Sequence, residues 1–389
     1  MCFLCRGLQL LAVQSVARGE AYSTKSPAED LGRELLNSMG RQPSPSNAFH
    51  LCVQLGLMKH HENLFVREAG VRQEFPEEVV KEAKAMMEKP PPDPDASIRK
   101  DLSHLKVYAV DSEDTMEVDD GVSVERLPGN AGERIWVHIA DVTRWVREGS
   151  AMHLEARRRR TTTYLPEGSI PMFPAEVAHK LLSLRPGRDC YALSMGITLG
   201  NSGQIVDVIL TPSLIHVTYR LTYDDVEEML LSGLAGSSEE WELGRLSELS
   251  MMRYRYRVAN GSVDKYHKCL DCNVKVTDNP SVPAGYDIKI SPQDPTSKSV
   301  RLVTEMMVMV GEGMGRLGYQ SDVPLAYRTQ EPPEQEIDEA MLEGLPEKYC
   351  RAQAVFRYMS PAVTKMTPNR HWGLGLESYV QWSSPIRRW

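Results

Sequence analysis

The chain has 389 residues, of which 41% are hydrophobic and 25% charged, and its formal net charge is −8. This composition is that of an ordinary globular protein, which excludes a disordered or fibrous chain, and the length allows two or three domains. No apolar run reaches about eighteen residues, so the sequence predicts no membrane span. The seven cysteines are too few and too scattered for a disulfide framework, and their odd number fits a reducing compartment.

The first part of the chain is predicted to be helical. Residues 1–25 contain one acidic residue and two arginines; this resembles an organelle presequence, and we leave the segment unassigned. Helices follow from Ser26, where a capping serine precedes proline and a capping-box glutamate, and then near 46–56 and 76–88. The sequence KPPPDPD at 89–95 predicts a stiff linker, because no helix can cross it.

Beyond the linker the hydrophobic pattern changes to a period of two. In RIWVHIADV, Ile135, Val137 and Ile139 fall on one face of a predicted strand. A hairpin is expected to turn at 200–203, and a short helix is expected over 151–160. A longer helix has apolar residues at helical spacing, so its methionines are expected in the core: Leu302, Val303, Met306, Met307, Val310, Met314 and Leu317. Strands and helices mix without a regular βαβ repeat, which predicts an α+β fold with a mixed sheet.

The stretch DSEDTMEVDDG, residues 111–121, gathers four aspartates and two glutamates in eleven positions. Neighbouring carboxylates repel by about 4 kcal/mol per pair at short range, so a fold that keeps them together usually supplies a cation. The spacing does not fit a calcium-binding EF-hand loop, and no glycine-rich phosphate loop is present. Two interpretations remain open: a site for one or two Mg²⁺ ions that serve phosphodiester chemistry, or a solvated acidic loop.

Charge is distributed unevenly along the chain. Residues 101–125 contain eight acidic residues and one lysine, a balance of −7, whereas the last 39 residues contain six basic residues and one glutamate, a balance of +5. A polyanion can therefore bind the basic segment while a divalent cation neutralises the acidic one. Two C-x-x-C pairs, Cys2/Cys5 and Cys269/Cys272, lie too far apart in sequence for a familiar zinc module, so we assign them no metal.

Three long motifs carry a resemblance to a known family: DSEDTMEVDDGVSVE, WVHIADVTRWVREGSAMHLEARRRRTTTYLPEGSIPMFP and HWGLGLESYVQWSSPIRRW. Together they resemble the catalytic RNB module of the ribonuclease II/R family, and most closely its plant organelle branch. The likeness covers 105–389, and the helical region 26–95 resembles the helix-turn-helix-like region of that branch. The resemblance implies an α+β RNB fold around an RNA channel, and hydrolysis of single-stranded RNA from the 3′ end to nucleoside 5′-monophosphates.

The resemblance also implies a set of site residues. The metal-binding acids of the family fall on Asp111, Glu117, Asp119 and Asp120, for one or two Mg²⁺ ions, with Mn²⁺ as an alternative. Asp119 takes the place of the essential aspartate that helps to activate water, and Glu117 stands where bacterial members have aspartate. Arg387, in SPIRRW, matches the arginine that stabilises the transition state, and its alternative is an ordinary surface cation.

Two further residues match contacts to the RNA terminus. Tyr164 matches an aromatic residue that stacks on the terminal nucleotide, and its alternative is a half-buried core tyrosine. Glu305 matches a glutamate that contacts the terminal ribose, and its alternative is a surface residue. The second stacking aromatic of the family is not placed, and the arginine run 157–160 is left out of the site because such runs usually face solvent.

The sequence departs from the family pattern at both ends. It stops at Trp389, where the family's module continues into further helices and an S1-type domain, and it lacks the expected N-terminal cold-shock domains. A second hypothesis is therefore a catalytically impaired RNA-binding remnant. For either hypothesis we expect single-stranded RNA as the partner, neither DNA nor a membrane, and a monomer. The expected location is the chloroplast or mitochondrion, with the cytoplasm as the alternative.

Overall fold

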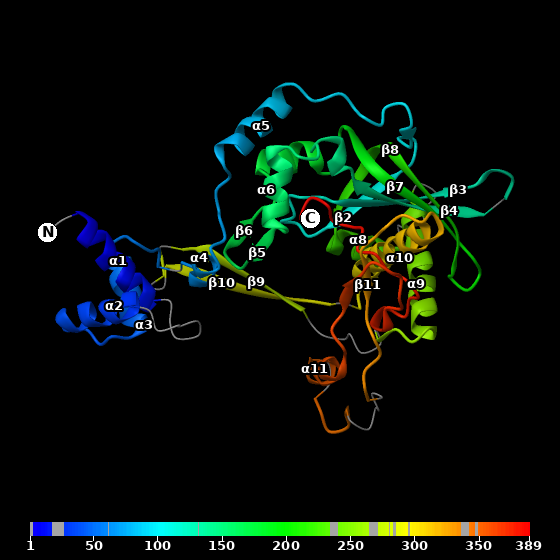
Figure 1. Ribbon diagram of the computed structural model, residues 1–389. Helices are drawn as coiled ribbons and strands as arrows, with labels where there is room; N and C mark the ends of the chain where they lie inside the picture. Colours follow the sequence, from blue (N-terminus) through cyan, green and yellow to red (C-terminus); the bar gives the residue numbers. More distant parts are fainter. Residues whose placement is uncertain are drawn as a thin grey trace. The chain divides into compact units, whose positions relative to one another are not determined.

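The computed structural model describes residues 3–17, 27–60, 62–130, 132–233, 240–263, 271–279, 281–282, 285–294, 296–335, 342–346 and 349–389. The chain divides into two compact units. We call them the helical unit (Met1–Glu74, Leu165–Gly168 and Val274–Ile290) and the barrel unit (Phe75–Tyr164, Ser169–Asn273 and Ser291–Trp389). Figure 1 labels their helices and strands.

The helical unit is built around four helices: α1 (Phe3–Ala17), α2 (Pro27–Ser38), α3 (Pro45–Gln54) and α4 (Leu64–Glu68). Their apolar faces meet in a core that includes Val16, Leu36 and Leu51. Gly32 allows α2 to approach α1 closely, because a Cβ atom there would clash with the carbonyl group of Ala12. The predicted helix near 46–56 is confirmed. The capping serine predicted for α2, Ser26, lies outside the described residues.

The compact units divide the chain at other points than the predicted domain bounds, which stay predictions, and two helices show the difference. Helix α1 packs against α2 and α3, so the helical unit begins ahead of residue 26. A helix with few acidic residues has the composition of a presequence. Composition alone therefore did not assign residues 1–25 to a domain. Helix α5 (Glu77–Glu88), whose predicted bounds are confirmed, belongs to the barrel unit because its buried Val79 and Ala83 join that unit's core. The proline-rich stretch 89–95 contains no helix, as expected.

Within the described residues, six strands form the main sheet: β1 (Lys100–Asp101), β2 (Val107–Asp111), β3 (Asp120–Arg126), β4 (Glu133–Ala140), β7 (Asp189–Leu199) and β8 (Ile205–Thr222). Their order is β1-β8-β2-β3-β4-β7, and β7 also pairs with β8, so the sheet closes into a barrel. Strand β8 pairs antiparallel with β7 along its first part and parallel with β2 along its last part. The predicted hairpin is confirmed, and Gly203 has the positive φ (88°) that its turn requires.

The two faces of the strands belong to two cores. On β2, Val107 and Ala109 lie in one core with α5 and α6 (Ala151–Arg159), whereas Tyr108 and Val110 lie in the other. The second core is covered by α8 (Tyr223–Ser232), α9 (Trp241–Ala259) and α10 (Lys298–Gln320). Figure 1 shows these three helices gathered beside the strands. The predicted core role of the α10 methionines is confirmed for Met306, which is fully buried.

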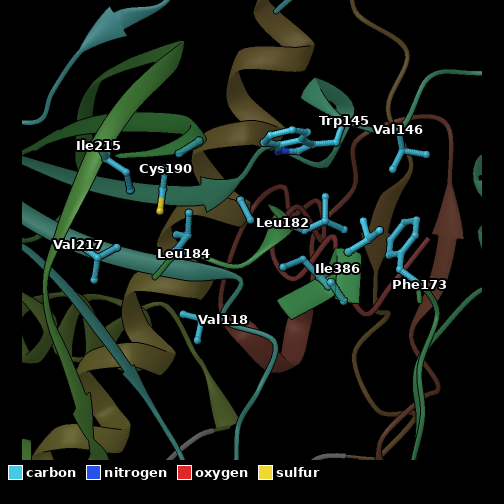
Figure 2. Close-up of a cluster of buried hydrophobic side chains, with 14 of the residues drawn as sticks. Val118, Trp145, Val146, Phe173, Leu182, Leu184, Cys190, Ile215, Val217 and Ile386 are labelled. Carbon is cyan, nitrogen blue, oxygen red and sulfur yellow. The ribbon is translucent and has the colours of Figure 1, made fainter. Parts of the chain in front are cut away.

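The first core also anchors two segments that lie far apart in sequence. Val118, between β2 and β3, and Ile386, near the C-terminus, are both buried in the cluster drawn in Figure 2. Each of these apolar side chains is adjacent in sequence to predicted site residues, because Val118 lies between Glu117 and Asp119 and Ile386 precedes Arg387. Burial of the apolar neighbour therefore fixes the position of the charged residue.

The remaining elements are short strands and helices: β5 (Thr163–Leu165), β6 (Gly168–Ile170), α7 (Ala175–Val177) followed by a π-helical turn (Ala178–Leu182), β9 (Asp271–Asp278), β10 (Tyr286–Gln293), β11 (Tyr327–Thr329), α11 (Tyr349–Tyr358) and β12 (Val363–Lys365). Among the helices of the described ranges, none combines the length and the apolar character needed to cross a membrane.

Candidate active site

The acidic residues of the motif lie where two neighbouring strands meet the loop that joins them. Asp111 ends β2 and Asp120 begins β3, and these strands pair antiparallel through Tyr108 and Val122. The intervening residues 112–119 have no regular secondary structure. We call Asp111, Glu117, Asp119 and Asp120 the carboxylate cluster. Of these, Glu117, Asp119 and Asp120 are buried, so the solvated-loop interpretation does not hold for them.

Electrostatic coupling shows that the four carboxylates lie near one another. Burial, and then the negative charges of Asp111 and Asp119, raise the pKa of Asp120 to about 7. Burial, followed by the charge of Asp119, raises the pKa of Glu117 to about 7. Burial also raises the pKa of Asp111 and brings that of Asp119 to about 6. The structure thus brings these four predicted residues together.

Arg387 supplies the positive charge of this site. Its Nε donates to Asp119 Oδ2 at 2.8 Å, and the backbone N–H of Ile386 donates to Asp119 Oδ1 at 2.7 Å. Burial lowers the pKa of Arg387, but the charge of Asp119, followed by other anionic groups, raises it by more, so the net shift is upward. A guanidinium group held against the cluster in this way is not an ordinary surface cation.

Tyr164 lies at the edge of the same site. Its hydroxyl donates to Glu117 Oε2 at 3.4 Å, and the hydroxyl of Thr162 donates to the same oxygen at 3.5 Å. Burial, and then the charge of Glu117, raise the pKa of Tyr164 to about 12. The residue as a whole is nevertheless 60% exposed, so it is not a core tyrosine, and its ring is open to a stacking partner.

Glu305 lies in a different environment. Its two carboxylate oxygens accept from Arg257, at 3.0 Å from Nε and 2.5 Å from Nη2, and both residues are almost fully buried. The alternative of a surface residue is therefore wrong. No described contact joins Glu305 to the carboxylate cluster, and its contact with a ribose stays a prediction. In the arginine run, Arg158 and Arg159 pair with Glu155.

Two residues near the cluster were missed by the sequence analysis. Burial, and then the charges of Asp111 and Asp120, raise the pKa of Tyr223 to about 12, which places its hydroxyl near the cluster. Arg220 donates to the carbonyl oxygens of Ser112 and Thr115 in the acidic loop. Arg220 lies at the end of β8 and Tyr223 begins α8 directly after it; β8 pairs with β2 in parallel, so that Thr222 lies opposite Asp111. No local signal in the sequence indicates this pairing.

The donor set fits a hard divalent cation in its chemistry. Four carboxylates share a buried site, their mutual repulsion and burial raise their pKa values, and such oxygens are the ligands that Mg²⁺ prefers. As the side chains are placed, no three acidic, histidine or cysteine side chains of the described ranges are close enough together to hold a metal ion, and Arg387 provides the countercharge. Cys2 and Cys269 of the C-x-x-C pairs lie outside the described residues.

Comparison with known proteins identifies the family. A family model described as RNB domain matches residues 99–389, and one described as Double HTH domain matches residues 9–64. The chain therefore belongs to the RNB family. The sites and the domain boundaries predicted from sequence are not tested by these matches and stay predictions.

Relatives at the sequence level are ribonucleases by name. An uncharacterized ribonuclease from Synechocystis is 40% identical over 356 residues, which cover 92% of this chain and 51% of the relative. Ribonuclease II, chloroplastic/mitochondrial, from Arabidopsis thaliana is 36% identical over 375 residues, which cover 95% of this chain and 45% of the relative. The chain thus spans about half the length of these relatives.

A solved structure shares the fold. RNase R from Mycoplasma genitalium, in complex with ribose-methylated single-stranded RNA, matches with a TM-score of 0.72 and 21% sequence identity, over 84% of this chain and 54% of that chain. At this level of identity the likeness shows the fold alone. The α+β architecture predicted from the sequence is confirmed as an RNB fold.

Proposed function

We propose that this protein is a 3′-to-5′ exoribonuclease that hydrolyses single-stranded RNA to nucleoside 5′-monophosphates, with Mg²⁺ or Mn²⁺ as the cofactor. The observation that carries this proposal is the burial of the carboxylate cluster around Arg387. Membership of the RNB family and the ribonuclease names of the relatives support the same activity. The RNA bound to the RNase R of similar fold supports RNA as the ligand.

The proposed mechanism divides the chemistry between the ion and the protein. A bound divalent ion would supply a water of lowered pKa and positive charge near the scissile phosphate. The carboxylate cluster would hold it. Asp119 is held in one orientation because Ile386 N–H binds one of its oxygens. Arg387, which lies beside Asp119, would neutralise the negative charge that grows on the phosphate oxygens in the transition state.

The RNA terminus would be positioned by residues that take no part in bond breaking. The exposed ring of Tyr164 would stack on the terminal base, which contributes about 1–3 kcal/mol and tolerates any sequence. Glu305 is the proposed contact to the terminal ribose. Arg257 binds both of its oxygens, and each of these oxygens keeps a lone pair that can accept from a ribose hydroxyl. To test this contact, Glu305→Gln is compared with the parent by the ratio of two measured quantities: the activity on RNA and the affinity for DNA of the same sequence.

The name of the plant relative supports a location in the chloroplast or mitochondrion. We propose that the protein acts there as a monomer on single-stranded RNA. Import of the tagged protein into isolated plastids and mitochondria would test the location, and sedimentation would test the oligomeric state.

The activity is tested with a 5′-labelled single-stranded RNA and Mg²⁺, with and without a chelator. The parent protein should give a ladder of shortened products, and Asp119→Asn should slow their formation by at least about 100-fold while RNA binding persists. Asp207→Asn is the matched control, because it makes the same chemical change at an exposed carboxylate paired with Arg134. Asp119→Asn that degrades RNA as fast as the parent would rule out the mechanism.

The second candidate function is a catalytically impaired RNA-binding protein of the same family. It is favoured by the pairing of Asp119 with Arg387 and by the absence of three metal-binding side chains close together in the described ranges. The same assay separates the two functions. The second is supported if the parent binds RNA in a salt-dependent way yet forms no product with Mg²⁺ or Mn²⁺.

A further inference from the structure

The loop that contains Glu117 depends on contacts from outside itself. Residues 112–118, the acidic loop, have no regular secondary structure, although they join two metal-ligand candidates at the ends of β2 and β3. Within the loop, Thr115 N donates to Ser112 O at 3.1 Å, and Thr115 Oγ1 donates to Asp111 Oδ1 at 3.3 Å. These contacts shape one turn, but they do not fix the loop against the barrel.

Arg220 of β8 holds the first half of the acidic loop. Its Nη2 donates to Ser112 O at 3.0 Å and to Thr115 O at 3.5 Å, and its Nη1 donates to Leu221 O at 2.8 Å. The parallel register that pairs Ala109 with Arg220 brings the guanidinium group to the end of β2 where the loop begins. The planar guanidinium group binds two loop carbonyls while it remains fixed to its own strand.

Ser183 holds the second half of the loop. Val118 N donates to Ser183 Oγ at 3.1 Å, and this hydroxyl lies 2.8 Å from Ala178 O and 3.3 Å from Met116 O. The next residue, Leu184, adds a backbone contact: its N donates to Val118 O at 3.0 Å. Ser183 is buried, so water does not replace these bonds without a rearrangement.

One side of the acidic loop faces open space. A cavity of about 300 Å³ lies beside it, and its wall includes Thr115, Met116, Arg185 and Arg220. On the cavity side, a loop residue that shifts therefore meets space and not another side chain. The hydrogen bonds of Arg220 and Ser183 limit such a shift, together with the burial of Val118 and its bond from Leu184 N.

We propose that Arg220 and Ser183 are positioning residues that hold the acidic loop in the conformation from which Glu117 and its neighbours bind the divalent cation. This inference rests on the proposed function and deepens it. Burial raises the pKa of Asp111, and the charge of Arg220 lowers it in part and so favours the ionised carboxylate, but the same charge repels a cation. The hydrogen bonds to the loop carbonyls explain why an arginine occupies this position despite that repulsion.

Repulsion and positioning predict opposite signs for one substitution. If Arg220 acted through its charge, Arg220→Met would tighten cation binding. If Arg220 positions the loop, Arg220→Met should weaken cation binding by about 10–100-fold, the usual effect of losing a partner that orients a metal ligand. Arg220→Lys keeps the charge and can donate to the loop carbonyls, but it lacks the second nitrogen that binds Leu221 O, so it should fall between the parent and Arg220→Met. Ser183→Ala, which changes no charge, should also weaken binding.

The experiment measures the dissociation constant of Mn²⁺ from the full chain by electron paramagnetic resonance, which reports free Mn²⁺ independently of turnover. Arg185→Met is the matched control: it removes a positive charge from the same cavity wall, and in the described part of the chain its guanidinium group makes no hydrogen bond to the loop. It should leave Mn²⁺ affinity unchanged or slightly higher. The Michaelis constant for RNA should stay near that of the parent in every positioning variant, and excess Mn²⁺ should restore kcat.

Each outcome has a defined meaning. Unchanged or tighter Mn²⁺ binding in Arg220→Met and Ser183→Ala overturns the positioning role, while a parent that binds Mn²⁺ more tightly than Asp119→Asn keeps the proposed function standing. A parent that binds no better than Asp119→Asn overturns both. Circular dichroism melting checks that each variant is folded, and if Arg220→Met is not, Arg220→Lys and Ser183→Ala carry the test by themselves.

Discussion

The balance of buried positive and negative charge differs between the α9–α10 interface and the carboxylate cluster. Between the two helices, each buried arginine meets one glutamate: Arg253 pairs with Glu312, and Arg257 pairs with Glu305. In the cluster, four carboxylates share the charge of Arg387. Burial raises the pKa of all four, and repulsion by a neighbouring carboxylate raises it further for Glu117, Asp119 and Asp120. In a matched pair the two charges cancel, whereas the cluster is left with an excess of negative charge.

This difference separates structural charge from functional charge. A buried matched pair is costly to break, and because its two charges neutralise each other it takes no part in bond breaking. An unmatched cluster is maintained against repulsion, and a site of that kind is the usual place for a cation or a reaction. Substitutions that alter one region and leave the other intact test this difference.

The largest expected effect on stability comes from breaking a matched pair. Arg253→Met leaves Glu312 buried without its cation and removes the bond to Gly203 O at 2.6 Å, so unfolding in urea should show a loss of about 3–5 kcal/mol. Mg²⁺ should not restore it. Arg370→Met, in an exposed pair with Glu377, is the control and should cost at most about 1 kcal/mol.

Arg387→Met makes the same chemical change in the unmatched cluster. It should also lower stability in the presence of a chelator, but here Mg²⁺ should restore it, because a bound ligand at 100 times its Kd adds about 2.7 kcal/mol. Equal rescue of the Arg253 and Arg387 variants by Mg²⁺ would remove the distinction between the two regions.

The next effect is a pH dependence from a buried group that is kept neutral. His138 lies between Ser123 Oγ (2.9 Å from Nε2) and Ser194 Oγ (2.7 Å from Nδ1), and burial lowers its pKa to about 3. An unfolded histidine titrates near 6.5, so between these values the unfolded state binds more protons, and stability falls as the pH falls through this window. The slope is at most about 1.4 kcal/mol per pH unit.

His138→Gln removes this titration. The difference in unfolding free energy between parent and variant should therefore change with pH below about 6.5 and be constant above it. Urea unfolding from pH 4 to pH 8 measures it, and taking the difference cancels the titration of the carboxylates in both proteins. A difference that does not vary with pH would mean that His138 binds protons equally well in the folded and unfolded states, so that burial does not lower its pKa.

A smaller effect is expected when an acid is replaced by its amide. The change in stability should have one sign in the cluster and the opposite sign at the α9–α10 interface. Asp120→Asn relieves repulsion in the cluster and, with a chelator present, should stabilise the protein by about 1–2 kcal/mol while it impairs catalysis. Glu312→Gln leaves Arg253 without its anion and should destabilise it. Thermal unfolding of the two variants side by side measures the signs, and a shared sign would contradict the comparison.

Local signals in the sequence were sufficient for several elements. The period of two around Ile135, the turn at Gly203 and the helical spacing over α10 each depend on neighbouring residues, and each predicted the observed structure. The closure of the barrel could not be predicted in this way. It depends on β8 pairing with both β7 and β2, and the choice of partner for a strand is made by residues far apart in sequence.

The candidate site shows the same limit. The acids could be found because they crowd together in eleven positions, and Arg387 was found through a motif. Arg220 and Tyr223 were missed because only the parallel pairing of β8 with β2 brings them to the acidic loop. The partner of Glu305 was missed for a related reason, since Arg257 is on a different helix and no spacing rule connects the two.

The smallest effect on stability is expected at the edge of the cluster, where Tyr164 is 60% exposed. Tyr164→Ala removes a ring that the fold hardly buries, so the free energy of unfolding should change by no more than about 0.5 kcal/mol. Its weak hydrogen bond to Glu117, at 3.4 Å, adds little to that value.

Binding of RNA should change by more than stability does, because stacking on the ring contributes about 1–3 kcal/mol for one base. Tyr164→Phe separates the two roles of the residue: it keeps the ring and loses the hydroxyl, so it should bind a short single-stranded RNA almost as well as the parent. Fluorescence anisotropy with a chelator present measures binding without hydrolysis. Equal losses for Tyr164→Ala and Tyr164→Phe would assign the contribution to the hydroxyl and its bond to Glu117, and Tyr164 would then belong to the carboxylate cluster and not to an RNA-stacking surface at its edge.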